Sequence, residues 1–183
     1  MNVFITGGFG FIGSNFILKF INDSNINILN YDKLTYAGNQ DNLETIKNHS
    51  SYRYIIGDIC NKDMLKKAIA DFKPNIILHF AAESHVDRSI EEPFQFIETN
   101  VLGTSILLNE TLNYYNQLSY NEKHSFKFIH ISTDEVYGSI SEGSFNEHSN
   151  FSPNSPYSAS KASAEHFVNA WSKTYNLPIN IVN

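Results

Sequence analysis

Two adjacent carboxylates, Asp134 and Glu135, come shortly after an apolar-rich run at residues 126–131 that is typical of a buried strand. In open α/β sheets, ligands bind outside the carboxyl ends of the strands, and acids placed there without a nearby cation point to a functional site. A solvated acidic turn is the alternative. These two residues alone do not decide between a functional site and an acidic turn. The decision depends on the other elements of the chain.

A tyrosine and a lysine four residues apart, Tyr157 and Lys161, follow in the next predicted element. Ser155 can cap a helix and Pro156 fits its first turn, which predicts a helix from residue 155 to about 175. Tyr157 and Lys161 then share one face, so the ammonium can reach the phenol directly or through a ribose hydroxyl. A surface pair on an amphipathic helix is the alternative.

The chain begins with a β-type run at residues 2–6, a glycine-rich turn and then apolar residues at helical spacing. Gly10 and Gly13 combine with either Gly8 or Gly7 to fit two dinucleotide-binding templates. The missing side chains let the backbone approach a pyrophosphate, whose charge is received by the unpaired N–H groups of the following helix. A flexible turn is the alternative, but the strand before and the helix after favour a dinucleotide site.

Acids at the ends of the second and third predicted strands bear on which dinucleotide binds. The second strand ends at Asp32, whose carboxylate can accept hydrogen bonds from the adenosine ribose and repels a 2′-phosphate, which favours NAD over NADP. Lys33 weakens this preference, because a cation there can hold a phosphate. Asp58 follows a strand at residues 52–56, and it either reads the adenine amino group or caps the next helix, at residues 62–72.

The fourth predicted strand, residues 75–80, is followed by two alanines and a polar run. Ala81 and Ala82 leave room for a dinucleotide to pass, and the polar run suggests a ligand-binding wall. We interpret His79 as a hydrogen-bonded strand residue rather than a base. The role of His85 is left open.

Six strands alternate with helices, and the last strand begins near residue 177. This order predicts a Rossmann-like, doubly wound parallel α/β sheet with strand order 3-2-1-4-5-6. No repeat or linker interrupts it, so we expect residues 1–183 to form one NAD-binding domain. A long helix at residues 93–115 has apolar residues on more than one face, and together with the helix that begins at residue 155 it predicts a homodimer interface.

Composition excludes several other classes of function. The 183 residues carry a net charge of −6 and their lysines and arginines are scattered, so no basic patch suggests a nucleic-acid or membrane partner. Cys60 is the single cysteine, which excludes an internal disulfide and suits a reducing compartment. We find no secretory leader and no run of about 18 apolar residues, so we expect a cytoplasmic protein. We predict no metal site.

Several stretches of the chain resemble the extended short-chain dehydrogenase/reductase family. The glycine turn and the Tyr157/Lys161 pair mark the superfamily. Residues 153–162, which contain this pair, belong to the same superfamily signal. The stretches between the two motifs resemble the 4,6-dehydratases that act on dTDP-glucose; these are residues 32–39, 81–90 and 132–138. Members of this family continue into a smaller C-terminal nucleotide-sugar domain, which does not follow Asn183. The resemblance therefore implies that the chain is the N-terminal part of a longer protein.

The resemblance implies an enzyme that dehydrates a nucleoside-diphosphate hexose, dTDP-glucose, to its 4-keto-6-deoxy product, while NAD is reduced and re-oxidised within one turnover. It also implies that Ser84 and Thr133 contact the substrate. The implied cofactor-binding residues are Gly7, Gly10, Phe11, Ile12, Gly13, Asp32, Lys33, Leu34, Thr35, Asp58, Ile59, Phe80, Ala81, Ala82, Ser84, Thr99, Tyr157 and Lys161.

The same resemblance implies a role for each catalytic residue. Tyr157 would take the proton of the C4 hydroxyl, and Lys161 with the positive nicotinamide would lower the pKa of the phenol from ~10 to about 7. Glu135 would remove the C5 proton, while Asp134, held protonated by the neighbouring charge, would donate to the departing C6 hydroxyl. Thr133 would hydrogen-bond the C4 oxygen.

Two alternatives differ from this interpretation in what they require. An epimerase or decarboxylase of the same family would share the glycine turn and the Tyr157/Lys161 pair but would not need the acid pair. A non-catalytic NAD-binding module would bind NAD without turning over a sugar nucleotide. For the dehydratase itself, the sequence leaves open whether the nucleotide is thymidine or uridine.

Overall fold

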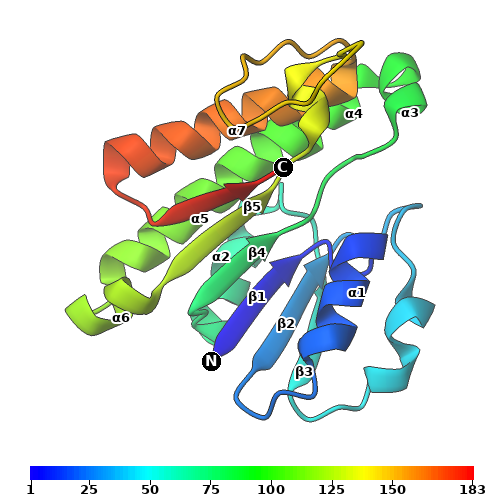
Figure 1. Ribbon diagram of the computed structural model, residues 1–183. Coiled ribbons are helices and arrows are strands. Elements are labelled where there is room, and N and C mark those ends of the chain that lie inside the picture. The colour runs from blue at the N-terminus through cyan, green and yellow to red at the C-terminus, as the bar shows by residue number, and fades with distance from the viewer.

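The computed structural model describes residues 1–183 as helices packed on both faces of one six-stranded sheet (Figure 1). Neighbouring strands follow the order β3-β2-β1-β4-β5-β6, and every pair is parallel. The predicted fold class and strand order are confirmed. The strands are β1 (Asn2–Thr6), β2 (Asn27–Asp32), β3 (Tyr52–Ile56), β4 (Ile76–His79), β5 (Lys127–Ile131) and β6 (Ile179–Val182).

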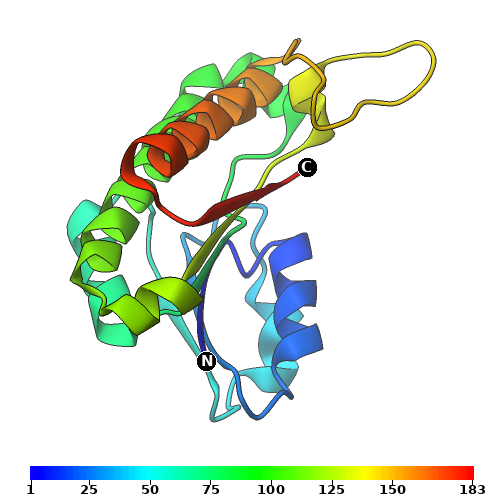
Figure 2. The ribbon, with the colours of Figure 1, turned by 60° about the vertical axis from the view of Figure 1, so that its left-hand side comes forward.

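Different helices cover the two faces of the sheet, as the two views in Figures 1 and 2 show. One face carries α1 (Phe11–Phe20) and the 3-10 helix η1 (Gln40–Ile46), and the other carries α2 (Lys62–Phe72), α5 (Thr104–Gln117) and α7 (Pro156–Tyr175). Side chains alternate between the two faces of the sheet along β1, so β1 contributes to the hydrophobic core on both faces. Val3 and Ile5 pack in the cluster that contains Ile17 of α1, whereas Phe4 packs in the cluster that contains Leu107 of α5.

The direction of strand addition reverses at β1, which pairs with β2 on one side and with β4 on the other. Thr6, the last residue of β1, lies opposite Tyr31 of β2 and His79 of β4. Strands β2 and β3 are added in turn on one side of β1, and β4, β5 and β6 are added in turn on the other side. Such a switch point opens a crevice at the carboxyl ends of the strands, where doubly wound sheets bind ligands.

The helix predicted at residues 93–115 is present as one continuous helical run, residues 93–117, but its middle turns are π-helical rather than α-helical. It consists of α4 (Pro93–Phe96), the π-helical segment η2 (Ile97–Gly103) and α5, and it is preceded by an additional helix, α3 (Val86–Glu91). Asn100 lies in the wider turns of η2, and its amide hydrogen-bonds the backbone of Glu83 and the hydroxyl of Ser160. The spacing of apolar residues, on which the helix prediction rests, contains no information about hydrogen bonds between the Asn100 side chain and the backbone of a distant residue.

Two further short helices, α6 (Tyr120–Ser125) and η3 (Asp134–Tyr137), were not expected from the sequence. The acidic stretch after β5 thus forms a 3-10 turn rather than an open loop. Thr133 caps this turn, because its hydroxyl accepts the N–H of Glu135 at 3.2 Å. The cap sets the directions in which the two carboxylates leave the end of β5.

Helix α7 starts as predicted. The hydroxyl of Ser155 accepts the N–H of Ser158 at 3.0 Å, and Pro156 occupies the first turn. An N-cap of this kind stabilises a helix by about 1 kcal/mol. The cap therefore fixes where Tyr157 and Lys161 stand relative to the strand ends.

Candidate functional site

The glycine turn brings the start of α1 against the end of β4. Gly7 has φ +76°, and a Cβ placed on it would lie 2.5 Å from the backbone nitrogen of Ala81. A Cβ on Gly13 would lie 2.4 Å from the carbonyl oxygen of Gly7. Only glycine fits at these two positions. Gly10 caps α1 without a side-chain hydrogen bond, so the first-turn amides of α1 are available to a ligand.

Of the two glycine templates, the structure favours the one formed by Gly7, Gly10 and Gly13. These three residues line the cavity described next. Gly8 instead packs against Asn30, whose Oδ1 accepts the Gly8 N–H at 3.0 Å, and a Cβ on Gly8 would approach that oxygen to 2.4 Å. Gly8 is therefore required for packing rather than for approach to a ligand.

A cavity of about 430 Å³ lies along the carboxyl ends of β1, β2, β4 and β5. Every residue of the predicted cofactor set lines it except Leu34, whose N–H instead donates to Asp32 Oδ1 at 2.7 Å. The sequence reasoning assigned no role to some lining residues, although all lie in or beside the stretches that it singled out. They are Tyr31, Ala37, Gly38, Gly57, Glu83, His85, Ile131 and Ser132.

Asp32 is held firmly at one end of this cavity, beside the ends of β2 and β3. It is only 8% exposed, and its Oδ2 accepts the N–H of Phe9 at 2.9 Å while its Oδ1 accepts that of Leu34. A carboxylate oxygen can accept more than one hydrogen bond, so both oxygens can also accept from a ribose diol. The fixed negative charge at this place is unfavourable for a phosphate.

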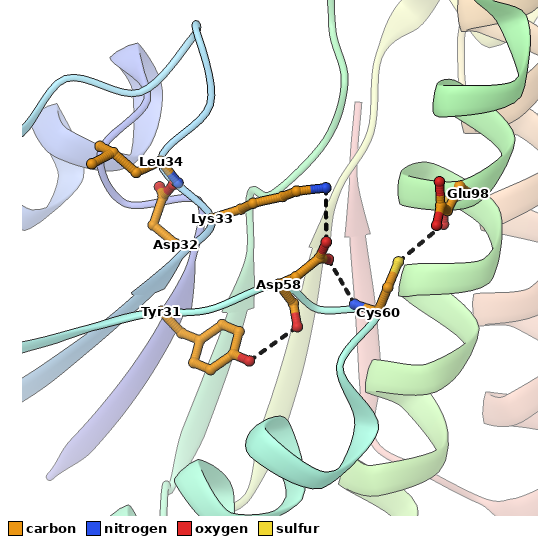
Figure 3. A network of polar contacts seen from close by, with 7 residues as sticks. All are labelled: Tyr31, Asp32, Lys33, Leu34, Asp58, Cys60 and Glu98. Carbon is orange, nitrogen blue, oxygen red and sulfur yellow. Dashed lines mark hydrogen bonds and ion pairs between the residues drawn. The ribbon is translucent and has the colours of Figure 1, made fainter.

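Lys33 extends away from Asp32 and reaches Asp58, as Figure 3 shows, with Nζ 2.7 Å from Asp58 Oδ2. This contact raises the pKa of Lys33. Burial by itself would raise the pKa of Asp58, but the Lys33 ammonium and the Cys60 N–H outweigh it and hold that pKa below its usual value. The following helix is capped by Asn61, so the capping alternative for Asp58 was wrong.

Lys161 supplies a buried amine to the other end of the cavity. It is 4% exposed, and its Nζ donates to the carbonyl oxygen of Ile131 at 2.7 Å. Burial lowers the pKa of Lys161 to about 8, against an opposing contribution from the Glu165 carboxylate. The side chain is therefore mainly a cation at neutral pH, with further N–H donors to offer.

Tyr157 lies on the same face of α7 and also lines the cavity. Its pKa is raised in the protein alone, first by burial and then by the charges of Glu135 and Asp134, while the Thr133 side chain partly offsets the rise. The expected lowering by Lys161 is thus not present in the protein without a ligand. A nearby positive ligand would have to overcome the effect of burial.

The two acids follow Ser132, which lines the cavity, but do not line it themselves. Asp134 is exposed and Glu135 is half-buried, and neither these two residues nor Thr133 line the cavity. Their charges nevertheless contribute to the raised pKa of Tyr157, which does line the cavity. The Thr133 hydroxyl also donates to Asp134 Oδ1 at 3.4 Å, a long contact.

His79 is a structural histidine, as predicted. Its Nδ1 is 2.7 Å from the Thr6 hydroxyl and its Nε2 is 2.9 Å from the Thr104 hydroxyl. Burial lowers the pKa of His79 to about 3, so the ring is neutral and joins β1, β4 and α5. His85 lines the cavity, beside Ser84.

The structure contains neither a candidate metal site nor a helix that could span a membrane. No group of three or more His, Cys, Asp or Glu residues is arranged to hold a metal ion. None of the helices combines the length and the apolar character needed to cross a membrane.

Sequence comparison relates most of the chain to known dehydratases. Residues 4–183 match the sequence family described as GDP-mannose 4,6 dehydratase. The chain is 47% identical over 193 residues to the dTDP-glucose 4,6-dehydratase of Escherichia coli, covering 100% of this chain and 53% of the relative. It is also 47% identical over 185 residues to the enzyme of that name from Haemophilus influenzae, covering 100% and 55%. The chain spans about half the length of the curated relatives it matches.

Solved structures of two dehydratases and of one epimerase are similar to this chain. The dTDP-glucose 4,6-dehydratase of Streptomyces venezuelae, whose structure has NAD bound, matches with a TM-score of 0.88 and 40% identity, over 99% of this chain and 54% of that one. The Bacillus anthracis enzyme in complex with NAD matches with a TM-score of 0.85 and 40% identity, over 99% and 53%. A UDP-glucose 4-epimerase from Thermotoga maritima matches with a TM-score of 0.84 and 27% identity, over 99% and 54%.

The lowered pKa of Lys161 predicts a pH dependence of stability. A lysine titrates at ~10.4 when unfolded, so folding disfavours its charged form by an amount on the order of 3 kcal/mol. This penalty is complete below about pH 8 and is relieved as the pH rises toward the unfolded value. Wild-type protein should therefore gain stability relative to Lys161→Met between about pH 7.5 and about pH 9.5, measured as urea midpoints of the full-length protein.

The matched control for this experiment is Lys173→Met, which removes an exposed lysine from the same helix. This variant should follow the wild-type pH dependence. A constant difference between wild type and Lys161→Met across this range would contradict the assignment of a lowered pKa to Lys161.

Proposed function

The chain belongs to the GDP-mannose 4,6-dehydratase family, and from that premise we propose that the protein carrying it removes water from dTDP-glucose, with NAD as cofactor, to give the 4-keto-6-deoxy sugar. One observation carries the proposal: the glycine turn, the Tyr157/Lys161 pair and the acids after β5 meet at one edge of the sheet. A glycine turn alone would support only dinucleotide binding, and the acid pair alone only an acidic turn.

The residues at the glycine turn fit a dinucleotide. Gly7 and Gly13 leave out Cβ atoms that would close the turn, and the uncapped start of α1 presents N–H groups and the positive end of its dipole to a pyrophosphate. Asp32 fits the adenosine ribose, because its carboxylate can accept hydrogen bonds from the ribose hydroxyls. When bound, NAD would take a hydride from the sugar and return it within the same turnover.

The charges at the adenosine end support NAD rather than NADP. The Asp32 carboxylate would repel a 2′-phosphate. Lys33, the cation that could attract such a phosphate, is paired with Asp58. Since Lys33 is half-exposed, this ion pair contributes only modestly to the preference for NAD. The preference therefore depends on the three residues together.

Tyr157 would act as the base that removes the proton of the C4 hydroxyl. The phenol is buried and its pKa is raised in the protein alone, so it needs a positive partner to ionise near neutral pH. Lys161 is that partner among the protein side chains, because it is mainly charged at neutral pH and can still donate hydrogen bonds after bonding Ile131. Lys161 would therefore act together with the positive nicotinamide to hold Tyr157 as a phenolate.

The two acids would carry out the elimination. Once C4 is a ketone, the C5 proton is acidic, and Glu135 would remove it as a carboxylate. Asp134 would donate a proton to the C6 hydroxyl, which leaves as water. Thr133 would hydrogen-bond the C4 oxygen with the hydroxyl that now caps η3. The proton leaves C5 and the hydroxide leaves C6 as one water, which leaves a C5–C6 double bond. The hydride removed from C4 would then return to C6 and the proton held by Glu135 to C5, so the 4-keto-6-deoxy sugar differs from the substrate by the loss of one water.

We further propose that residues 1–183 form one NAD-binding domain, with the sugar nucleotide held largely by the remainder of the full-length protein. A single continuous sheet supports this division. Apolar side chains exposed on α4, η2 and α7 support a homodimer through these helices; they include Phe94, Ile97 and Phe167. A cytoplasmic location agrees with the free thiol of Cys60.

The direct test is to incubate the full-length protein with dTDP-glucose and, separately, with UDP-glucose. Mass spectrometry and NMR should detect a 4-keto-6-deoxy product from dTDP-glucose with the loss of one water. Epimerisation at C4 without loss of water would support an epimerase instead. NAD binding without any turnover would support a non-catalytic module.

Asp58→Asn should raise the affinity for NADP relative to NAD by about tenfold, because the released Lys33 ammonium can then pair with the 2′-phosphate. Calorimetric titration with each cofactor gives the two Kd values. The double variant Lys33→Met/Asp58→Asn is the control, and it should return to the wild-type preference. An unchanged NADP-to-NAD ratio in Asp58→Asn would show that the ion pair does not influence the choice.

Glu135→Gln should still oxidise C4 but stall before elimination, so that reduced cofactor accumulates and its near-ultraviolet absorbance rises with added dTDP-glucose. Turnover should fall at least about 100-fold, the usual contribution of a positioned base. Glu142→Gln, an exposed position in the loop before α7, is the matched control and should keep wild-type turnover. Undiminished product formation by Glu135→Gln would remove Glu135 from the role of base.

A further inference from the structure

Two loops on opposite sides of the glycine turn contact each other. One follows β2 and the other follows β4, and in the sheet these strands lie on either side of β1. Two neighbouring strand spacings separate them, about 10 Å. A side chain that joins the loops must therefore pass across the end of β1, where the glycine turn begins.

Tyr36 makes that connection. Its hydroxyl donates to Glu83 Oε2 at 3.0 Å, and the guanidinium carbon of Arg88 lies 3.7 Å from the centre of the Tyr36 ring. The contact thus combines a charge-assisted hydrogen bond with a cation–π interaction. We call the three side chains Tyr36, Glu83 and Arg88 the Tyr36 strap.

Both ends of the strap are anchored. On the β4 side, Glu83 is 8% exposed, and its backbone N–H and carbonyl both bond the side chain of Asn100, at 2.8 and 2.9 Å. On the β2 side, the N–H of Asn39 and the side chain of Asn42 donate to the carbonyl of Phe9 at 3.0 and 3.1 Å. The strap therefore joins two loops that are each fixed to the body of the domain.

The anchor on the β4 side also reaches the helix that carries the reacting tyrosine. Asn100 Nδ2 donates to Ser160 Oγ at 2.8 Å, and Ser160 Oγ donates to the carbonyl oxygen of Tyr157 at 2.7 Å. An unbroken series of hydrogen bonds thus runs from Tyr36 through Glu83 to α7. Neither the proposed binding of the pyrophosphate nor the proposed chemistry uses any of these contacts.

The residues that flank the strap line the cavity from two sides. Thr35, Ala37 and Gly38 contribute from the loop after β2, and Glu83, Ser84 and His85 contribute from the loop after β4. Both loops therefore contribute to the wall of the cavity that begins at the glycine turn. The Tyr36 strap holds these two loops together.

We propose that the Tyr36 strap retains the dinucleotide in its cavity, so that the same cofactor molecule serves successive turnovers. This rests on the proposed function, in which the cofactor returns to its starting state at the end of each turnover and need not exchange. The strap makes Tyr36 and Glu83 positioning residues for the cofactor, acting chiefly on the rate at which it leaves.

The test measures the release of NAD from the full-length protein. Wild type and Tyr36→Phe are loaded with radiolabelled NAD and chased with an excess of unlabelled NAD, and the label retained is followed over time. Tyr36→Phe removes the hydroxyl and keeps the ring under Arg88, and it should speed release about fivefold. Tyr120→Phe is the matched control, because Tyr120 is 76% exposed on α6, far along the chain from the cavity, and it should release NAD at the wild-type rate.

A second variant covers the case in which Tyr36→Phe does not fold. Arg88→Gln removes the charge over the ring at a partly exposed position, and it should also speed release, by about twofold. The melting temperature without NAD is measured for every variant. A lowered melting temperature with an unchanged release rate would mean that the contact only stabilises the loops, and this would overturn the proposal.

The outcomes also separate this inference from the proposed function. Normal NAD binding with wild-type release rates in both Tyr36→Phe and Arg88→Gln overturns the strap alone. Equal acceleration in Tyr120→Phe likewise overturns it, because the effect would not depend on the strap. Failure of the wild-type protein to bind NAD overturns the proposed function and, with it, the retention role.

Discussion

The close approach of the glycine turn to the ends of β1 and β4 is the constraint on which the rest of the site depends. At Gly7 a Cβ would meet the backbone of Ala81, and at Gly13 it would meet the carbonyl of Gly7. Because both Cβ atoms are absent, α1 begins directly against the strand ends and directs its free amides into the cavity. The reversal of strand order at β1 then brings the ends of β2, β4 and β5 to the same place.

The charges of the site are arranged along this crevice in two groups. At the ends of β2 and β3, the buried Asp32 lies near the Lys33–Asp58 ion pair. At the other end, Lys161 is a buried amine whose lowered pKa still leaves it mainly charged at neutral pH, next to a tyrosine that burial makes a weaker acid. The first group suits a ligand without an extra phosphate, and the second suits a proton transfer that begins only when a positive ligand is present.

Sequence reasoning predicted the features that local pattern determines. The strand order followed from β-α alternation, and the start of α7 followed from Ser155 and Pro156. It missed features that depend on contacts between distant residues. The bond between Tyr36 and Glu83 spans 47 positions, and the π-helical turn at Asn100 accompanies hydrogen bonds to a loop 17 positions away. Neither leaves a periodic signal in the chain.

Burial also raises the pKa of Tyr157 in the protein alone, and burial is a property of the folded state that no local sequence pattern encodes. Binding of a dinucleotide at the glycine turn can be measured by calorimetric titration of the full-length wild-type protein and of Gly13→Ala with NAD. We expect saturable binding at one site per chain by wild type, and loss of that binding in a Gly13→Ala protein that remains folded by circular dichroism. Equal NAD affinity in the two folded proteins would contradict this expectation.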